Sequence, residues 1–247
     1  MRSGQQYGEP VDSAMTALGA RATGWEFAWL DGRAGEPTWS YPELARALTR
    51  RAASLLDLDT GSGELLAELA PLPAHTVAVE SWARNTPVAR ERLGPFGVPV
   101  LTELPGGEDE FDVVLSRHGR LPAADIARLL RPGGRLLSQQ VGSDDLAGLN
   151  AALGAPAAHL RTWNAEVAAA ALTAAGLEVT DVREERPPIT FTDVGAVVRQ
   201  LRDLPWPVRH FTPARYRDAL DRLDTFIRLH GGLTVTFHRF LVEAVRR

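Results

Sequence analysis

Two features of the sequence predict an α/β fold with a parallel sheet covered by helices. Short apolar runs alternate with helix-like segments along residues 51–185, and each run is apolar at nearly every position, as strands buried on both faces are. The second feature is the stretch "LLDLDTGSGELLAELA" (residues 55–70), where the first run passes through a glycine turn into a helix. A ligand site is therefore expected at the carboxyl ends of the strands, where open sheets of this kind bind their ligands.

The individual elements follow from local signals. Ser40 and Glu43 have the spacing of a capping box before a helix, while Thr86 and Gly94 mark the start and stop of another. A third helix ends at the "RPGG" of residues 131–134, and an alanine-rich helix ends at Gly176. Strands are expected at the short apolar runs 55–58, 76–79, 98–101, 111–115 and 135–139, and a sixth strand at "LEVTDVREE" (177–185).

Beyond residue 185 the alternation breaks. The segment 186–232 is predicted to form two helices, capped by Thr192 and Thr212 and joined by the proline-rich "DLPWPVRHF". The closing "LTVTFHRFLVEAVRR" (233–247) is interpreted as one long strand with His238 and Arg239 on its solvent face. We expect a single domain over 1–247. Its parts are an N-terminal cap (1–50) rich in aromatic side chains, a core sheet (51–185 and 233–247) and a helical lid insertion (186–232).

Composition narrows the classes of function. The 247 residues carry 27 Lys and Arg against 31 Asp and Glu, a formal net charge of -4, and this balance disfavours nucleic acid as a partner. The chain has no cysteine, which excludes thiol nucleophiles and zinc–thiolate sites. Its histidines and acids show no metal-ligand spacing. No apolar run is long enough to span a bilayer, so a soluble cytoplasmic protein without a membrane partner is expected.

The glycine turn predicts a nucleoside-containing ligand. Gly61 and Gly63 let the backbone approach a ligand closely at a helix start, and Glu80, at the end of the next expected strand, suits ribose hydroxyls. Dinucleotides and S-adenosylmethionine are both bound in this way. A dinucleotide turn requires a third glycine where Leu66 stands, and no phosphate-cradling lysine motif is present. Asp57, inside the strand, suits a ligand that carries an amino group and a sulfonium charge.

The order of these motifs resembles the class I S-adenosylmethionine-dependent methyltransferases over about residues 51–185, with the closing strand added. "LLDLDTGSGE" is similar to the family's first motif, "VAVES" to its acidic second strand, and "EFDVVLSRHG" to its fourth strand. "IARLLRPGGRLLSQQ" resembles the helix, turn and fifth strand. The resemblance implies a Rossmann-like, doubly wound, seven-stranded sheet with an antiparallel last strand, and transfer of a methyl group from S-adenosylmethionine to a nucleophile.

The resemblance also implies roles for particular residues. Asp57, Gly61 and Gly63 match the positions around the methionine part of the cofactor, and Glu80 matches the acid on its ribose. The other matching positions are Ser81 and Trp82 beside the adenine, and Ser116 and Arg117 facing the methyl group.

Two departures from the family pattern concern the cofactor site. Asp59 replaces the first glycine of the turn, where its carboxylate either helps to hold the ligand's amino group or disturbs the turn. The usual acid after the third strand is absent, and Glu103 is the candidate to replace it in binding the adenine amino group.

Methyl transfer depends mainly on alignment of the acceptor and exclusion of water, and a general base is needed only for a protonated acceptor. His118, after the fourth strand, is the first candidate base and His210 the second; a backbone-bonded histidine is the alternative reading. Gln139, Gln140 and Trp206 are candidate substrate contacts or, equally, packing residues. The leading hypothesis is a methyltransferase for a small-molecule acceptor. The alternatives are a methyltransferase-like binding or accessory protein without catalysis and, third, an NAD-dependent oxidoreductase.

Overall fold

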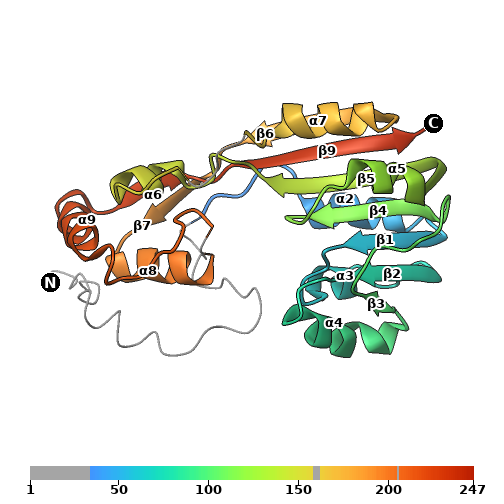
Figure 1. Cartoon of the computed structure of the whole chain (residues 1–247), viewed down its shortest axis with the longest axis horizontal. Coiled ribbons are helices and arrows are strands. Elements are labelled where there is room, and N and C mark those ends of the chain that lie inside the picture. The colour runs from blue at the N-terminus through green and yellow to red at the C-terminus, as the bar shows by residue number, and fades with distance from the viewer. Residues whose placement is uncertain (1–33, 158–161, 205) are drawn as a thin grey trace, which may run out of the picture. The chain divides into compact units, whose positions relative to one another are not determined.

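The computed structural model describes residues 34–157, 162–204 and 206–247, which form two compact units (Figure 1). One unit, called the sheet unit below, contains residues 37–142, 162–185 and 239–247. The other, called the hairpin unit, contains the described residues among 1–36, 143–161 and 186–238. The aromatic N-terminal residues before 34 lie outside the described part.

A seven-stranded sheet forms the centre of the sheet unit (Figure 1). Strands β1 to β5 run parallel in the order β3-β2-β1-β4-β5, and β9 and β6 complete the sheet, with β9 antiparallel to both neighbours. This confirms the predicted fold, including the antiparallel last strand. The strands are β1 (Ser54–Leu58), β2 (His75–Val79), β3 (Val100–Leu101), β4 (Phe111–Arg117), β5 (Leu130–Val141), β6 (Leu177–Glu185) and β9 (Arg239–Arg246).

Helices cover both faces of this sheet because its strands are apolar on both sides. Alternate residues of β1 enter different cores: Leu56 packs with α5 (Ala123–Leu129) and α7 (Ala165–Ala174). Leu55 packs with α2 (Tyr41–Thr49), α3 (Glu64–Glu68) and α4 (Asn85–Leu93) on the other face. Ser40 caps α2 as predicted, accepting a hydrogen bond from the Glu43 N–H at 3.4 Å. The apolar runs therefore give a three-layer structure.

The hairpin unit has its own small sheet and core. Its strands β7 (Pro188–Phe191) and β8 (Leu233–Thr236) pair antiparallel. Around them are α6 (Ala147–Ala152), α8 (Val194–Asp203) and α9 (Arg217–His230). The core joins apolar residues of all five elements, among them Phe191, Val197 and Leu220. The segment 186–232 thus contains a strand besides the two expected helices.

The closing segment is two strands rather than the single strand that its alternation predicts. β8 pairs within the hairpin unit and β9 within the sheet unit. His238, expected on a solvent face, lies between them and is only 1% exposed. Its backbone N–H donates to Asp145 Oδ1 at 2.8 Å, and its Nδ1 accepts from the Asp144 N–H. The alternating pattern predicted one strand because it does not reveal that the chain passes from one sheet to the other at residue 238.

Three predicted helix caps are displaced. Asp193, not Thr192, caps α8, since its carboxylate accepts from the Ala196 N–H at 2.7 Å. Thr212 accepts from the Arg215 N–H in a turn before α9 begins. Thr86 lies within the first turn of α4.

Candidate functional site

The candidate site lies at the carboxyl ends of β1, β2, β4 and β5, called the ligand edge below. β1 pairs with β2 on one side and with β4 on the other, so the strand order reverses direction at β1. Ligands of open α/β sheets bind outside the carboxyl ends of the strands at such a switch point. The residues at and after these strand ends are 59–63, 80–82 and 117–120, together with Gln139 and Gln140 near the end of β5.

Glu80 joins the glycine turn to the end of β2. Its Oε2 accepts a hydrogen bond from the Gly61 N–H at 2.8 Å, and its Oε1 accepts from the Trp82 N–H at 2.7 Å. Gly61 has a φ of 65°, a conformation that favours glycine. Glu80 is only 4% exposed. Each carboxylate oxygen has a further lone pair, so Glu80 retains the capacity to accept hydrogen bonds from two ligand hydroxyls.

Gly63, the other glycine of the turn, is required by packing. It has a φ of 78°, and a Cβ at this position would lie 2.9 Å from Leu93 Cγ of α4. The first helical turn after β1 therefore lies close against α4, which fixes the position of the glycine turn.

Asp57 is a buried carboxyl directly below this turn. It is 5% exposed within β1, and burial raises its pKa to about 7, with the nearby Asp59 and Glu80 charges adding to the rise and the Thr60 hydroxyl opposing it. Three carboxyl groups thus gather around one turn. A cationic ligand would relieve their repulsion, whereas a pyrophosphate would increase it.

Asp59, the departure from the family's glycine, does not disturb the turn. It adopts a φ of 51°, which aspartate tolerates better than most residues. Its carboxylate accepts from the Arg120 backbone N–H at 2.6 Å and forms an ion pair with Arg120, Nη2 to Oδ1, at 2.7 Å. Gly119 allows this approach, because a Cβ there would lie 2.6 Å from the Asp59 Cβ. Asp59 therefore connects the loop after β1 to the loop after β4.

Arg120 lies at the ligand edge, and its contact with Asp59 was not predicted from the sequence. Its partner lies 61 positions earlier in the chain, so no local pattern connects them. The one feature of the sequence that could have indicated a nearby cation was Asp59 itself. An additional acid in a turn that is already acidic is stabilised by a positively charged partner.

His118 is held by a chain of hydrogen bonds that fixes its tautomer. The Trp39 indole Nε1 donates to Gln139 Oε1 at 2.7 Å, and Gln139 Nε2 lies 2.9 Å from His118 Nε2. An indole N–H only donates, so the Gln139 oxygen must face Trp39 and its amide NH₂ must face the imidazole. His118 Nε2 is therefore the acceptor, and the ring proton resides on Nδ1.

The electrostatic surroundings of His118 favour the same neutral form. The residue keeps solvent-exposed surface, yet the surrounding protein desolvates the ring, and this together with the charges of Arg239 and Arg117 holds the pKa of His118 well below its usual value. Its backbone N–H also donates to the Gln139 carbonyl at 2.7 Å. The predicted base is thus a neutral imidazole whose free nitrogen lone pair is already engaged.

Gln140 and Ser116 support the edge from within the sheet. Gln140 Nε2 donates to Ser116 Oγ at 3.1 Å and to Ser138 Oγ at 2.9 Å. Ser116 Oγ donates in turn to the Arg120 carbonyl at 3.1 Å. Because Gln140 and Ser116 are both buried, their contacts fix the loop that carries His118 and Arg120.

The remaining predicted residues are distributed over both units. At or near the ligand edge, Arg117 lies over the Tyr41 ring at 5.8 Å, Trp82 is 51% exposed, and Ser81 and Glu103 are also exposed. His210 is exposed and Trp206 half-buried, and both belong to the hairpin unit. Roles for these six residues stay predictions.

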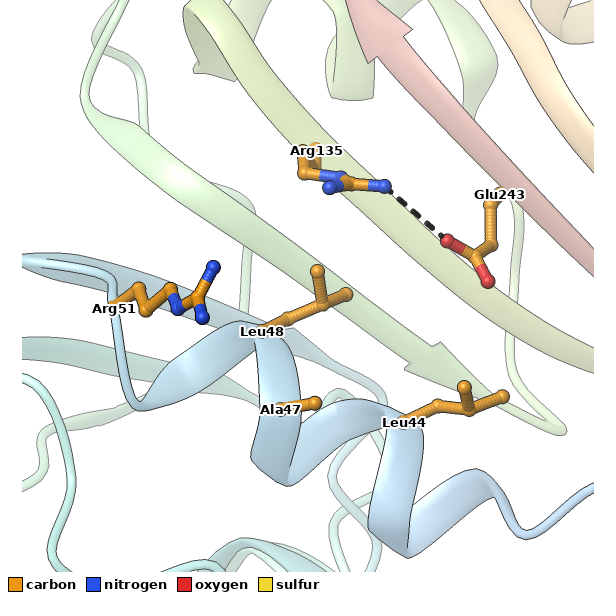
Figure 2. Close-up of a pocket in the computed structure, with 6 residues that line it drawn as sticks. All are labelled: Leu44, Ala47, Leu48, Arg51, Arg135 and Glu243. Carbon is orange, nitrogen blue, oxygen red and sulfur yellow. Dashed lines mark ion pairs between the residues drawn. The ribbon is translucent and has the colours of Figure 1, made fainter.

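A hollow of about 270 Å³ lies elsewhere on the sheet unit (Figure 2). Figure 2 shows Leu44 and Leu48 of α2 beside an ion pair in which Arg135 Nη2 lies 3.5 Å from Glu243 Oε2. Arg135 lies in the middle of β5 rather than near its carboxyl end, where Gln139 and Gln140 are. The hollow therefore lies between α2 and the face of the sheet rather than beyond the strand ends.

The sheet order, the glycine turn after β1 and the buried acid after β2 define a Rossmann-like α/β protein with its candidate site at the carboxyl ends of the strands. The chain belongs to the methyltransferase domain family, whose model matches residues 40–182. It is also 33% identical over 113 residues to a demethylmenaquinone methyltransferase of Clavibacter sepedonicus, a match that covers 38% of this chain and 46% of the relative. The chain thus spans about half the length of the curated relative that it matches.

Solved structures share the fold. A putative methyltransferase of Bacillus halodurans has a TM-score of 0.58 at 19% identity, with 83% of this chain and 96% of that chain covered. The [4+2]-cyclase SpnF has a TM-score of 0.54 at 16% identity, with 96% and 93% covered. A protein named for a different reaction thus shares the fold, so the site must decide the chemistry.

Two further observations concern the described residues alone. Among them, no helix is both long and apolar enough to cross a membrane. Within the same ranges, histidine, aspartate and glutamate side chains form no group of three that could hold a metal ion.

Proposed function

We propose that this protein transfers the methyl group of S-adenosylmethionine to a small-molecule acceptor. The observation that carries the proposal is the acidic ligand edge. Glu80 is buried beside the Gly61 turn with acceptor capacity for ribose hydroxyls, and Asp57 below it has its pKa raised by burial and neighbouring charges. This set of groups favours a nucleoside that carries positive charge and disfavours the pyrophosphate of NAD.

The protein's side chains would bind the cofactor and align it with the acceptor, and would not themselves react. When bound, the cofactor supplies an electrophilic methyl group on a sulfonium. Glu80 would hold the ribose, the Gly61 backbone would allow close approach, and Trp82 offers an exposed ring for stacking on adenine. Alignment of this kind, with water excluded, provides much of the acceleration of a methyl transfer.

His118 would act as a hydrogen-bond donor rather than a base. Its Nε2 accepts from Gln139, so Nδ1–H is the group left for an acceptor molecule. Arg117, whose guanidinium lies over the Tyr41 ring, adds positive charge at the end of β4. These two groups favour an acceptor whose nucleophilic oxygen is already anionic, such as a phenolate, because such a nucleophile needs no base.

Calorimetric titration with S-adenosylhomocysteine, S-adenosylmethionine and NAD tests the proposal. We expect micromolar binding of the first two, weakened at least tenfold in Glu80→Gln, and no binding of NAD. The matched control is Glu243→Gln, which removes a carboxylate at the hollow of Figure 2 and should leave binding unchanged. Binding of NAD alone, or of none of the three, contradicts the proposal.

A second candidate function is a methyltransferase-like accessory protein that does not catalyse the reaction. The observation that favours it is the Asp59–Arg120 ion pair, which spans the ends of β1 and β4 at the proposed cofactor site. If this pair blocks the site, removing it should create cofactor binding that the wild-type protein lacks. The wild-type titration distinguishes the two candidates, since the accessory reading requires that S-adenosylmethionine not bind.

A further inference from the structure

We propose that Arg120 is a clamp for the α-carboxylate of the amino-acid part of the nucleoside ligand, and that Asp59 is the residue that positions it. The inference rests on the proposed function and adds a determinant of ligand specificity to it. It interprets the Asp59–Arg120 pair as part of the binding site rather than as an obstruction.

The guanidinium of Arg120 has two edges that can each bind a carboxylate. Its Nε and Nη2 face Asp59, with Nε 3.1 Å from both carboxylate oxygens and Nη2 2.7 Å from Oδ1. A guanidinium carries five N–H donors, so the edge formed by Nη1 and the second Nη2 hydrogen is left over. No described contact uses Nη1. Arg120 can therefore keep Asp59 on one edge and bind a second carboxylate with the other.

The exposures of the two side chains agree with this arrangement. The Asp59 side chain is 17% exposed, whereas that of Arg120 is 57% exposed. Asp59 thus lies beneath the guanidinium, and Arg120 presents its other side outward. Since the Arg120 backbone N–H also donates to Asp59 Oδ2, both the main chain and the side chain of Arg120 are oriented by one carboxylate.

The charges at the ligand edge explain why such a clamp is needed. Asp57, Asp59 and Glu80 surround the glycine turn and would repel the carboxylate of an amino acid. Arg120 is ion-paired with one of these acids and lies within electrostatic range of Glu80. Its guanidinium is therefore placed to offset the repulsion at the point where the amino-acid end of the ligand would lie, between the ends of β1 and β4.

The test compares two ligands that differ by one carboxylate. The first is S-adenosylhomocysteine, and the second is its decarboxylated analogue, 5′-(3-aminopropylthio)-5′-deoxyadenosine, which keeps the adenosine, the sulfur and the ammonium group. We expect the wild-type protein to bind the first at least tenfold more tightly. Arg120→Met, which keeps the aliphatic stem, should weaken S-adenosylhomocysteine at least tenfold and change the analogue less than twofold.

Two further variants complete the test. Asp59→Asn, which suits the same left-handed backbone, removes the charge that orients Arg120 and should reduce the preference between the ligands severalfold. Arg131→Met is the matched control, because Arg131 pairs with Asp112 at 3.1 Å at the amino ends of the strands. It should leave the affinities for both ligands unchanged.

Each outcome has one meaning. If Arg120→Met weakens both ligands equally, Arg120 only supports the turn and the clamp is wrong. If it strengthens both, the ion pair is an obstruction and the clamp is also wrong. If the wild-type protein binds neither ligand, the proposed function fails first, and the clamp fails with it. Thermal midpoints of all variants, measured without ligand, establish that each one is folded.

Discussion

At the scale of single residues, the ligand edge contains two groups whose pKa values the protein shifts so that the neutral form is favoured. Asp57 is buried beside other acids, and its pKa is raised to about 7. His118 is held neutral, with its pKa lowered. The two shifts have opposite effects on stability as the pH changes, so variants at each position separate them.

Replacing Asp57 by Asn should remove a pH dependence of stability. A carboxyl whose pKa is raised in the folded state stabilises fully below its unfolded pKa of 3.8 and loses that contribution as the pH rises to about 7. Denaturant unfolding of both proteins between pH 4 and pH 8 should therefore show a stability difference that grows in favour of the variant by a few kcal/mol. His118 affects both proteins alike and cancels. Parallel pH curves would show that Asp57 is not perturbed.

Replacing Gln139 by Glu should reverse the hydrogen bond to His118. A carboxylate still accepts from Trp39 but has no N–H to donate, so His118 Nε2 must become protonated to keep the contact. The pKa of His118, followed by NMR of the ring nitrogens, should rise from well below 6.5 to above it. Gln140→Glu places the same charge one residue along β5, beside Ser116 and Ser138, and should raise that pKa less. Equal rises in the two variants would contradict the proposed tautomer.

At the scale of elements, hydrogen bonds at the amino ends of the strands hold β1 and β4 together. Asp112 Oδ2 accepts from the Ala53 N–H at 2.8 Å and from the Ser54 N–H at 2.9 Å. The Asp112 Oδ1 pairs with Arg131 at 3.1 Å. Although this carboxyl is partly desolvated, these hydrogen bonds hold its pKa below its usual value. Asp112, at the start of β4, thus supplies the hydrogen-bond acceptor for the backbone N–H groups at the start of β1.

Asp112→Ala should destabilise the protein by about 1–3 kcal/mol at pH 7, because two backbone N–H groups lose their acceptor. A carboxyl with a lowered pKa stabilises above its unfolded pKa and loses that contribution as the pH falls through its folded value. The difference between wild type and variant should therefore shrink below about pH 4. Urea unfolding from pH 7 to pH 3 measures it. Asp181→Ala, which breaks a surface ion pair of similar exposure in β6, should cost less than about 1 kcal/mol. A difference that is constant with pH would contradict the role of the charge.

The elements that were predictable are those whose signals are local. β1, β2 and β4 contain short, mainly apolar runs, and Ser40 lies next to the helix that it caps. The β7–β8 pair was missed because its two short strands are separated by two helices and each has an exposed face. Half-buried strands of four residues give little periodic signal, and the partner of each is visible only in three dimensions.

At the scale of the whole molecule, the sequence predicted a ligand edge but not the contacts across it. Glu80 and Gly61 were predicted to belong to it because both occur in motifs with fixed order. The Asp59–Arg120 pair and the Trp39–Gln139–His118 chain connect residues that are distant in sequence. These contacts depend on the register of β1, β4 and β5, which no single stretch of sequence reveals.

Hydrogen exchange with and without saturating S-adenosylhomocysteine tests the whole assignment in one measurement. Backbone amides of 59–63, 80–82 and 117–120 should exchange more slowly with the ligand, since binding stabilises the local structure that it contacts. The amides around Arg131, at the amino ends of the strands, are the reference and should change only as far as global stability does.

Slower exchange in 206–211 would support the hypothesis that Trp206 and His210 of the hairpin unit take part in binding. Unchanged exchange there, together with protection at the ligand edge, would confine the cofactor site to the sheet unit. Protection around the hollow of Leu44 and Arg135 instead would place the ligand between α2 and the sheet rather than at the ligand edge and overturn the assignment.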